Sequence, residues 1–235
     1  MSHTTNTTTD IRNEKAPAAS STYAAFLLAG LAFLVVAPMF FYPIFLMKLL
    51  CFALFACAFN LLLGYTGLLS FGHATFFGGA AYFTAHAVKE WGWTPELGVL
   101  LGVAGAAVLG LVMGFVAIRR QGIYFAMITL ALSQMFFFFC LQAEFTRGED
   151  GIQQVPRGHL FGFIDLNVAT NMYYFVLAVF IIGLVVIWRF VNSPFGMILK
   201  SIRENEARAT SLGYSVAHYK LGAFVMSAAL AGLAG

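Results

Sequence analysis

The stretch "NLLLGYTGLLSFGH", residues 60–73, interrupts a run that otherwise has the composition of a bilayer-spanning helix. Three glycines and four polar residues stand in it: Asn60, Gly64, Thr66, Gly67, Ser70, Gly72 and His73. Lipid cannot satisfy exposed amides and carbonyls, so irregular backbone at membrane depth is tolerated only inside protein or beside a water-filled cavity. The glycines allow a break or a close helix contact, and the Asn, Thr and Ser side chains supply partners for the freed backbone. The stretch therefore predicts a broken helix that lines an interior cavity.

Two interpretations of this stretch remain open. A translocation path through the cavity would use six of its residues: Asn60, Gly64, Thr66, Gly67, Ser70 and His73. The alternative is a plain packing seam of small residues, as is common between membrane helices. The seam accounts for the glycines but accounts less well for the polar side chains.

The composition of the whole chain predicts a membrane protein. Of its 235 residues, 60% are hydrophobic and 10% are charged, whereas soluble domains average about 25% charged residues. We therefore predict an all-α, polytopic integral membrane protein, a helical bundle with a broken or re-entrant helix. With about 20 apolar residues per span, candidate spans lie at 24–42, 46–63, 72–88, 97–118, 123–142 and 172–190, and a seventh begins near residue 221. The seventh run is short for a full crossing, so the chain is expected to stop within a helix.

The distribution of basic residues predicts the orientation. Residues 1–22 are polar and are expected to form a disordered cytoplasmic tail, and residues 23–235 a single transmembrane domain. With the N-terminus inside, nine of the 13 Lys and Arg residues fall in the cytoplasm and four outside. Loops 89–96 and 144–167 then lie outside the cell and segment 192–220 lies in the cytoplasm. Whether 72–88 crosses fully or re-enters stays open.

Several classes of chemistry are disfavoured by what the sequence lacks. No Asp or Glu lies within a predicted span, which disfavours a proton-coupled transporter. No P-loop motif occurs, so ATP would have to be hydrolysed by a separate subunit. The three cysteines lie in apolar runs without metal-ligand spacing, so no metal site or other cofactor is expected. Neither the composition nor the charge indicates a nucleic-acid partner.

Ser70 and His73 form a Ser-x-x-His pair, which could suggest an intramembrane hydrolase. No acidic residue is placed to orient the imidazole, so no catalytic residue is predicted and the chain is not expected to be an enzyme. The structural alternative is that Ser70 caps a helix starting near Phe71, with His73 in its first turn at a buried polar seam.

The predicted cytoplasmic segment contains "NSPFGMILKSIRENEARATSLGYSVAHYKL", residues 192–221. Ser193-Pro194 is a helix start. Ser201 and Glu204 form a capping box for a second short helix, which Gly213 is placed to end. Arg208, four residues after Glu204, would add a side-chain pair. Two such helices suit docking against a partner protein, although a helix lying on the membrane surface is the alternative.

Four motifs carry a resemblance to a known family. They are "FNLLLGYTGLLSFGHATFFGGAAYF", "RRQGIYFAMITLALSQ", "TRGEDGIQQVP" and the segment "NSPFGMILKSIRENEARATSLGYSVAHYKLGAFVMSAALAGLAG". Together they closely resemble the LivM-type permeases of bacterial high-affinity branched-chain amino-acid ABC transporters. The resemblance covers the chain from about residue 46 to its last residue. Family members continue for several more spans beyond "AGLAG".

The resemblance implies a multi-pass subunit of the bacterial inner membrane. Its implied partners are a second, related permease, two ATPase subunits that bind the ATP, and a periplasmic binding protein that delivers leucine, isoleucine or valine. Glu206, Ala207 and Gly213 match the family's ATPase-contacting loop, and Arg203, Glu204 and Asn205 precede it directly. Urea and short-chain amide permeases share most of these motifs and remain alternatives, as does, from a different class, a membrane-embedded enzyme or channel.

Overall fold

The computed structural model describes residues 30–120, 122–156, 158–160 and 164–235, and the expected tail at 1–22 lies outside them. The chain divides into two units, the first ending at Phe40. The described part of this first unit is an apolar helix, Gly30–Met39, which ends in the 3-10 turn η1 (Ala37–Met39). The span expected at 24–42 is therefore described only in its second half.

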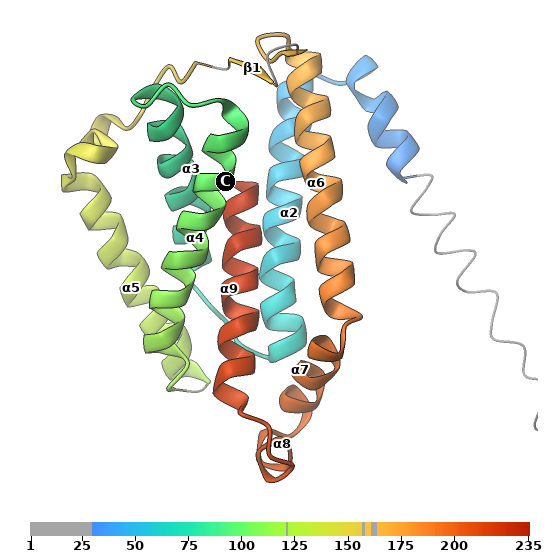
Figure 1. Ribbon diagram of the computed structural model, residues 1–235, viewed down its shortest axis with the longest axis vertical. Coiled ribbons are helices and arrows are strands. Elements are labelled where there is room, and N and C mark those ends of the chain that lie inside the picture. The colour runs from blue at the N-terminus through green and yellow to red at the C-terminus, as the bar shows by residue number, and fades with distance from the viewer. Residues whose placement is uncertain (1–29, 121, 157, 161–163) are drawn as a thin grey trace, which may run out of the picture. The chain divides into compact units, whose positions relative to one another are not determined.

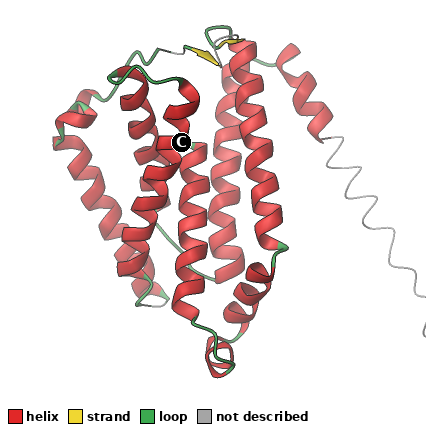
Figure 2. Cartoon of the chain, in the orientation of Figure 1, coloured by secondary structure: helices red, strands yellow, loops and turns green. Residues whose placement is uncertain are grey.

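The regular elements described in the second unit, Phe41–Gly235, are helices, apart from a pair of two-residue strands (Figures 1 and 2). Its long helices are α2 (Pro43–Thr66), α3 (His73–Lys89), α4 (Pro95–Ala117), α5 (Ile123–Gln142), α6 (Ala169–Val191) and α9 (Val216–Ala234). Its short elements are η2 (Glu144–Thr146), η3 (Gly148–Asp150), the antiparallel pair β1 (His159–Leu160) and β2 (Ile164–Asp165), α7 (Pro194–Glu204) and α8 (Glu206–Ser211). The prediction of an all-α polytopic membrane protein is confirmed.

Five helices in the described part of the chain are long and apolar enough to cross a membrane: α2, α4, α5, α6 and α9. Four of them coincide with predicted spans. The fifth, α9, corrects the prediction of a short run from residue 221, because the helix already begins at Val216 and has 19 residues. The sequence places Lys220 in a loop, whereas the structure buries it within α9.

The core of the second unit is built around α9, which lies between α4 and α2 (Figure 1). Small residues on α4 make this packing close. A Cβ atom on Gly110 would lie 2.5 Å from the Cβ of Ala228 on α9, and one on Gly102 would lie 2.9 Å from the carbonyl oxygen of Ala80 on α3. Backbone contact through small side chains is a usual basis for helix association in membranes.

The chain breaks between α2 and α3, as residues 60–73 predict. His73, the first residue of α3, lies beside Ala58, because Ser227 bonds to both of them. Ala58 is eight residues before the last residue of α2, or about 12 Å back along that helix. Residues 67–72 therefore return into the bundle without helical structure, and α3, with 17 residues, begins inside it.

The two predicted external loops lie together at one end of this unit. Glu90 accepts a 2.6 Å bond from Arg147, and Lys89 donates to the carbonyl oxygen of Gln153. The α7 and α8 helices lie at the opposite end, where α2 ends (Figure 1). The structure thus separates segment 192–220 from loops 89–96 and 144–167, as the alternating topology requires.

Candidate functional site

Three backbone amides of the irregular segment 67–72 donate to hydroxyl groups. The amide of Leu68 donates to Thr66 Oγ1 at 3.4 Å, and that of Gly72 donates to Ser70 Oγ at 3.3 Å. The amide of Phe71 donates to Thr129 Oγ1 of α5 at 3.2 Å. Thr66 and Ser70 therefore play the predicted part of partners for freed backbone.

A second polar junction lies where α3 begins and joins three helices. Ser227 of α9 donates its hydroxyl hydrogen to the carbonyl oxygen of Ala58 on α2, at 2.5 Å, and lies 2.8 Å from Nε2 of His73. Because that hydroxyl has a single hydrogen, Nε2 must be the donor to Ser227. The Nδ1 atom of His73 is then the unprotonated nitrogen, and among the described residues it has no hydrogen-bond partner.

This geometry removes the basis for a Ser-His nucleophile. Nε2 of His73 is engaged with Ser227, and the hydroxyl of Ser70 accepts from the backbone two residues on. The expected helix cap is also wrong, because α3 begins at His73 with Gly72 at its cap position and no side-chain cap bond. Ser70 stabilises the turn before the helix. The buried polar seam predicted for His73 is observed, at 2% exposure.

Two glycines of the break have different structural roles. Gly67 ends α2 at φ +71°, a left-handed conformation that favours glycine, and an added Cβ would meet only the Cγ of Arg203 at 3.4 Å. Gly72 is where the backbones come close, because a Cβ there would lie 2.9 Å from the carbonyl oxygen of Thr129. Close packing is therefore needed at Gly72, and a positive φ at Gly67.

Asn60 differs from the other residues predicted for the translocation path. It is exposed on the outer face of α2, where its amide lies against Gly64, and no bond to the broken backbone is seen. The prediction that Asn60 supplies partners for the freed backbone is wrong. Phe52 and Leu63 are also exposed on α2. Asn60 thus presents a polar group on an apolar helix, about 9 Å from the end of that helix.

The segment at the opposite end of the unit forms two short helices, as predicted, but they divide at a different residue. Ser193 caps α7 and accepts from the amide of Gly196. The expected capping box is wrong, because Ser201 and Glu204 both lie inside α7. Asn205 makes the break, with φ −155°, and its Oδ1 accepts from the amide of Arg208 to cap α8. Glu204 and Arg208 therefore belong to different helices.

The α8 helix ends as the sequence predicts. Gly213 follows it at φ +87°, and its amide donates to the carbonyl oxygen of Thr210 at 2.9 Å. The amide of Tyr214 donates to the carbonyl oxygen of Ala209 at 3.2 Å. Such bonds at a glycine with positive φ satisfy the last carbonyls of a helix and turn the chain sharply.

Arg203 links the residues predicted to contact the ATPase with those predicted for the translocation path. Its guanidinium donates to the carbonyl oxygen of Gly64, in the last turn of α2. Beside it, the ammonium of Lys200 lies 5.3 Å from the ring centre of Tyr65. Two cations of α7 thus lie at the C-terminus of α2, where the helix dipole is negative and attracts positive charge.

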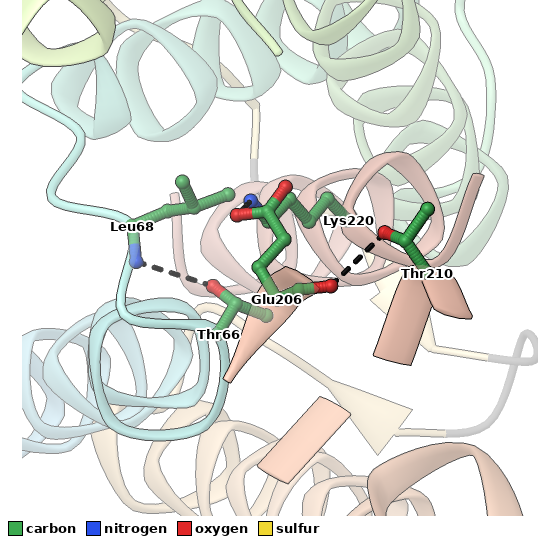
Figure 3. Close-up of polar contacts among 5 residues, drawn as sticks. All are labelled: Thr66, Leu68, Glu206, Thr210 and Lys220. Atoms are coloured by element: carbon green, nitrogen blue, oxygen red, sulfur yellow. Dashed lines mark hydrogen bonds and ion pairs between the residues drawn. The ribbon is translucent and has the colours of Figure 1, made fainter. Parts of the chain in front are cut away.

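An ion pair joins α8 to α9 (Figure 3). The ammonium of Lys220 donates to Oε2 of Glu206 at 2.7 Å. The Lys220 side chain is 7% exposed and that of Glu206 is 35% exposed. Figure 3 also shows the backbone oxygen of Glu206 accepting from Thr210, and the Thr66 to Leu68 bond of the break. No sequence motif predicts that Glu206 pairs with Lys220.

The apolar face of the α7 and α8 segment is used within the chain. Leu199 and Ile202 are buried, and Ile202 packs with Ala209 and Val216. A membrane-surface helix would need this face for lipid. A groove along α7 and α8 stays open, and both polar and apolar side chains line it. They include Met197, Ser201, Asn205, Arg208 and Leu212.

Among the described residues, no group of three or more His, Cys, Asp or Glu side chains lies close enough to hold a metal ion. Thr129 and Ser227, which no sequence motif indicated, complete the polar contacts of the break. The only sequence signal for them is a hydroxyl residue within an apolar run.

Comparisons with known proteins agree with this architecture. Residues 41–235, the whole second unit, match the family model described as "Branched-chain amino acid transport system / permease component". The chain is 31% identical, over 204 residues, to the high-affinity branched-chain amino acid transport system permease protein LivM of Escherichia coli, and 30% identical over 205 residues to that of Salmonella typhimurium. Each match covers 75% of this chain and 47% of the relative, so the chain spans about half the length of these curated relatives. No solved structure matches.

Proposed function

Because the chain belongs to the family of permease components of branched-chain amino acid transport systems, we propose that it is a membrane-spanning subunit of an ABC importer for branched-chain amino acids. It acts in the bacterial inner membrane beside a second, related permease. A periplasmic binding protein delivers the solute, and two ATPase subunits bind and hydrolyse the ATP. The N-terminus faces the cytoplasm, and so do α7 and α8.

The observation that best supports this proposal is the attachment of α7 and α8 to the transmembrane bundle. Arg203 binds the last turn of α2, and Glu206 binds α9. A subunit that hydrolyses no ATP itself needs such an element, because work done by a separate ATPase has to reach the spans through a rigid contact. In this proposal the ATPase docks on the surface formed by Arg203, Glu204, Asn205, Glu206, Ala207 and Gly213.

The break between α2 and α3 is proposed as part of the path for the solute. Its candidate residues are Asn60, Gly64, Thr66, Gly67, Ser70 and His73. Asn60 supports this role because an exposed amide within a membrane span is costly in lipid, and such groups usually face a cavity or another subunit. The outer face of α2 would then lie toward the second permease.

The test is an uptake assay with the complete complex in membrane vesicles. We expect ATP-dependent uptake of labelled leucine that excess isoleucine or valine suppresses and that urea or acetamide leaves unchanged. Suppression by urea or acetamide alone would favour the alternative solutes of the same family. Uptake that does not depend on ATP would contradict the proposal and favour a channel.

A further inference from the structure

We propose that Lys220 is a positioning residue that fixes α8 to α9 and thereby passes a displacement of α8 into the transmembrane bundle. This inference rests on the proposed function, since it concerns how work from an ATPase enters the spans. It assigns a role to a residue that is not among the six proposed to form the ATPase-docking surface. Three observations support it: the geometry of the Lys220 and Glu206 pair, the shortness of α8, and the position of Ser227 on α9.

The α8 helix cannot hold its place by its own backbone. It has six residues, and isolated helices shorter than about 12 residues are marginal in water. Its position must therefore come from anchors. Among the described contacts are the Asn205 cap at its start, the burial of Ala209 against Ile202, and the bond that Lys220 donates to Glu206.

Among these anchors the ion pair best resists separation of α8 from α9. Apolar contacts such as that of Ala209 allow sliding, because the hydrophobic effect is non-directional. Lys220 is almost fully enclosed, and a buried ammonium that loses its carboxylate is left as an uncompensated charge. Moving Glu206 away from Lys220 is therefore costly. When α8 moves, the favourable response is for α9 to move with it.

The α9 helix leads from this pair to the junction at the start of α3. Ser227 lies seven residues after Lys220, which is close to two helical turns, so the two side chains share one face about 10 Å apart. Ser227 bonds to Ala58 of α2 and His73 of α3. The buried side chains of Phe224 and Ala228 hold this part of α9 in the core. One rigid helix thus connects α8 with the broken segment.

The experiment measures solute taken up per ATP hydrolysed by the complete complex in vesicles, together with recovery of the ATPase on purification. Lys220→Met keeps the length of the side chain and suits a buried site. We expect it to insert and retain the ATPase, but to lower uptake per ATP by about tenfold. That factor corresponds to the interaction energies that double-mutant cycles give for residues in contact. Lys220→Arg keeps the charge and is expected to restore most of the uptake per ATP.

The matched control is Arg147→Met, which removes the cation of the exposed pair with Glu90 at the other end of the unit. It is expected to leave uptake per ATP unchanged. Wild-type uptake per ATP in Lys220→Met would overturn the inference, as would an equal loss in Lys220→Met and Lys220→Arg. Absence of ATP-dependent uptake in the unmodified complex would instead contradict the proposed function.

Discussion

Two ion pairs at opposite ends of the bundle have nearly equal lengths but differ in burial. Arg147 and Glu90 are 2.6 Å apart with side chains 51% and 43% exposed, whereas Lys220 and Glu206 are 2.7 Å apart with side chains 7% and 35% exposed. Water and salt screen an exposed pair, which contributes little to stability. A buried ammonium depends on its carboxylate. Burial therefore decides which of the two pairs can constrain movement.

The two ends also differ in what they connect. At the Glu90 end, the pair joins two loops, and Lys89 adds a bond to the backbone of Gln153. At the α8 end, Arg203 and Glu206 join short helices to the long helices α2 and α9. Loop contacts can rearrange without moving a span. Contacts to helix ends cannot, which is why we place the input of energy at the α8 end.

The largest effect is expected from Glu206→Lys. It places a second cation against the buried Lys220 and puts positive charge at the N-terminus of α8, where the helix dipole disfavours it. Breaking a buried pair costs about 3 kcal/mol or more, reduced here because Glu206 is 35% exposed. Uptake should fall to background while the protein still inserts. Purification of the complex should show reduced recovery of the ATPase, and wild-type recovery with wild-type uptake would remove α8 from the mechanism.

The second effect concerns the broken segment, where Gly72→Ala should destabilise the fold. Its Cβ would lie 2.9 Å from the carbonyl oxygen of Thr129, and overpacking of this kind costs about 2 kcal/mol. Gly78→Ala is the matched control, because nothing lies within 4 Å of its added Cβ. Thermal unfolding in detergent compares them. Equal unfolding temperatures for the two variants would show that the backbones do not approach closely at Gly72.

A smaller loss is expected from Ser227→Ala. The change removes the partner of His73 Nε2 and the donor to the carbonyl oxygen of Ala58, and an unsatisfied buried polar group costs about 1 to 2 kcal/mol. Ser201→Ala is the control, since the Ser201 hydroxyl is exposed and bonds only within its own helix. If both variants unfold at the same temperature, the three-helix junction contributes nothing to stability.

The smallest effect is expected at the exposed pair. Hydrogen bonding to Arg147 lowers the pKa of Glu90 below its ordinary value. A lowered pKa in the folded state means that the pair contributes at neutral pH and that its contribution is lost as the pH falls through that lowered pKa. Because both side chains are exposed, that contribution is small. Arg147→Met should lower the unfolding temperature at neutral pH only slightly, and the difference from the unmodified protein should vanish at high salt. A large fall in the unfolding temperature that high salt does not reduce would contradict the comparison of the two pairs.

Local sequence rules predicted much of the fold. The broken helix at residues 60–73, the Ser193-Pro194 start and the turn at Gly213 all depend on neighbouring residues, and all three are observed. The predicted boundary between α7 and α8 was wrong because two possible helix caps, Ser201 and Asn205, lie within ten residues of each other. Ser201 remained inside α7, where its hydroxyl bonds to the carbonyl oxygen of Met197, and Asn205 capped α8 instead.

The contacts between distant segments could not be predicted from one sequence. His73 and Ser227 are 154 residues apart, and Phe71 and Thr129 are 58 apart. Each serine or threonine by itself is an ordinary residue of an apolar helix. Lys220 was misplaced because a charged residue normally marks the end of a span, whereas here Glu206 allows it to be buried within a helix. One signal was readable, the Gly or Ala at every fourth position of residues 98–114, which predicts close helix contact.

We propose that the α8 end of the bundle faces the cytoplasm, where ATP is available, and that the Glu90 end faces outward. Single cysteines at Asp150 and Leu212, both exposed and at opposite ends, test it in intact cells with a membrane-impermeant thiol reagent. The parent chain, whose own cysteines lie at 51, 57 and 140, is the background control. We expect labelling of Asp150→Cys in intact cells, and labelling of Leu212→Cys only after the membrane is opened. Labelling of Leu212→Cys in intact cells, with Asp150→Cys protected, would contradict it.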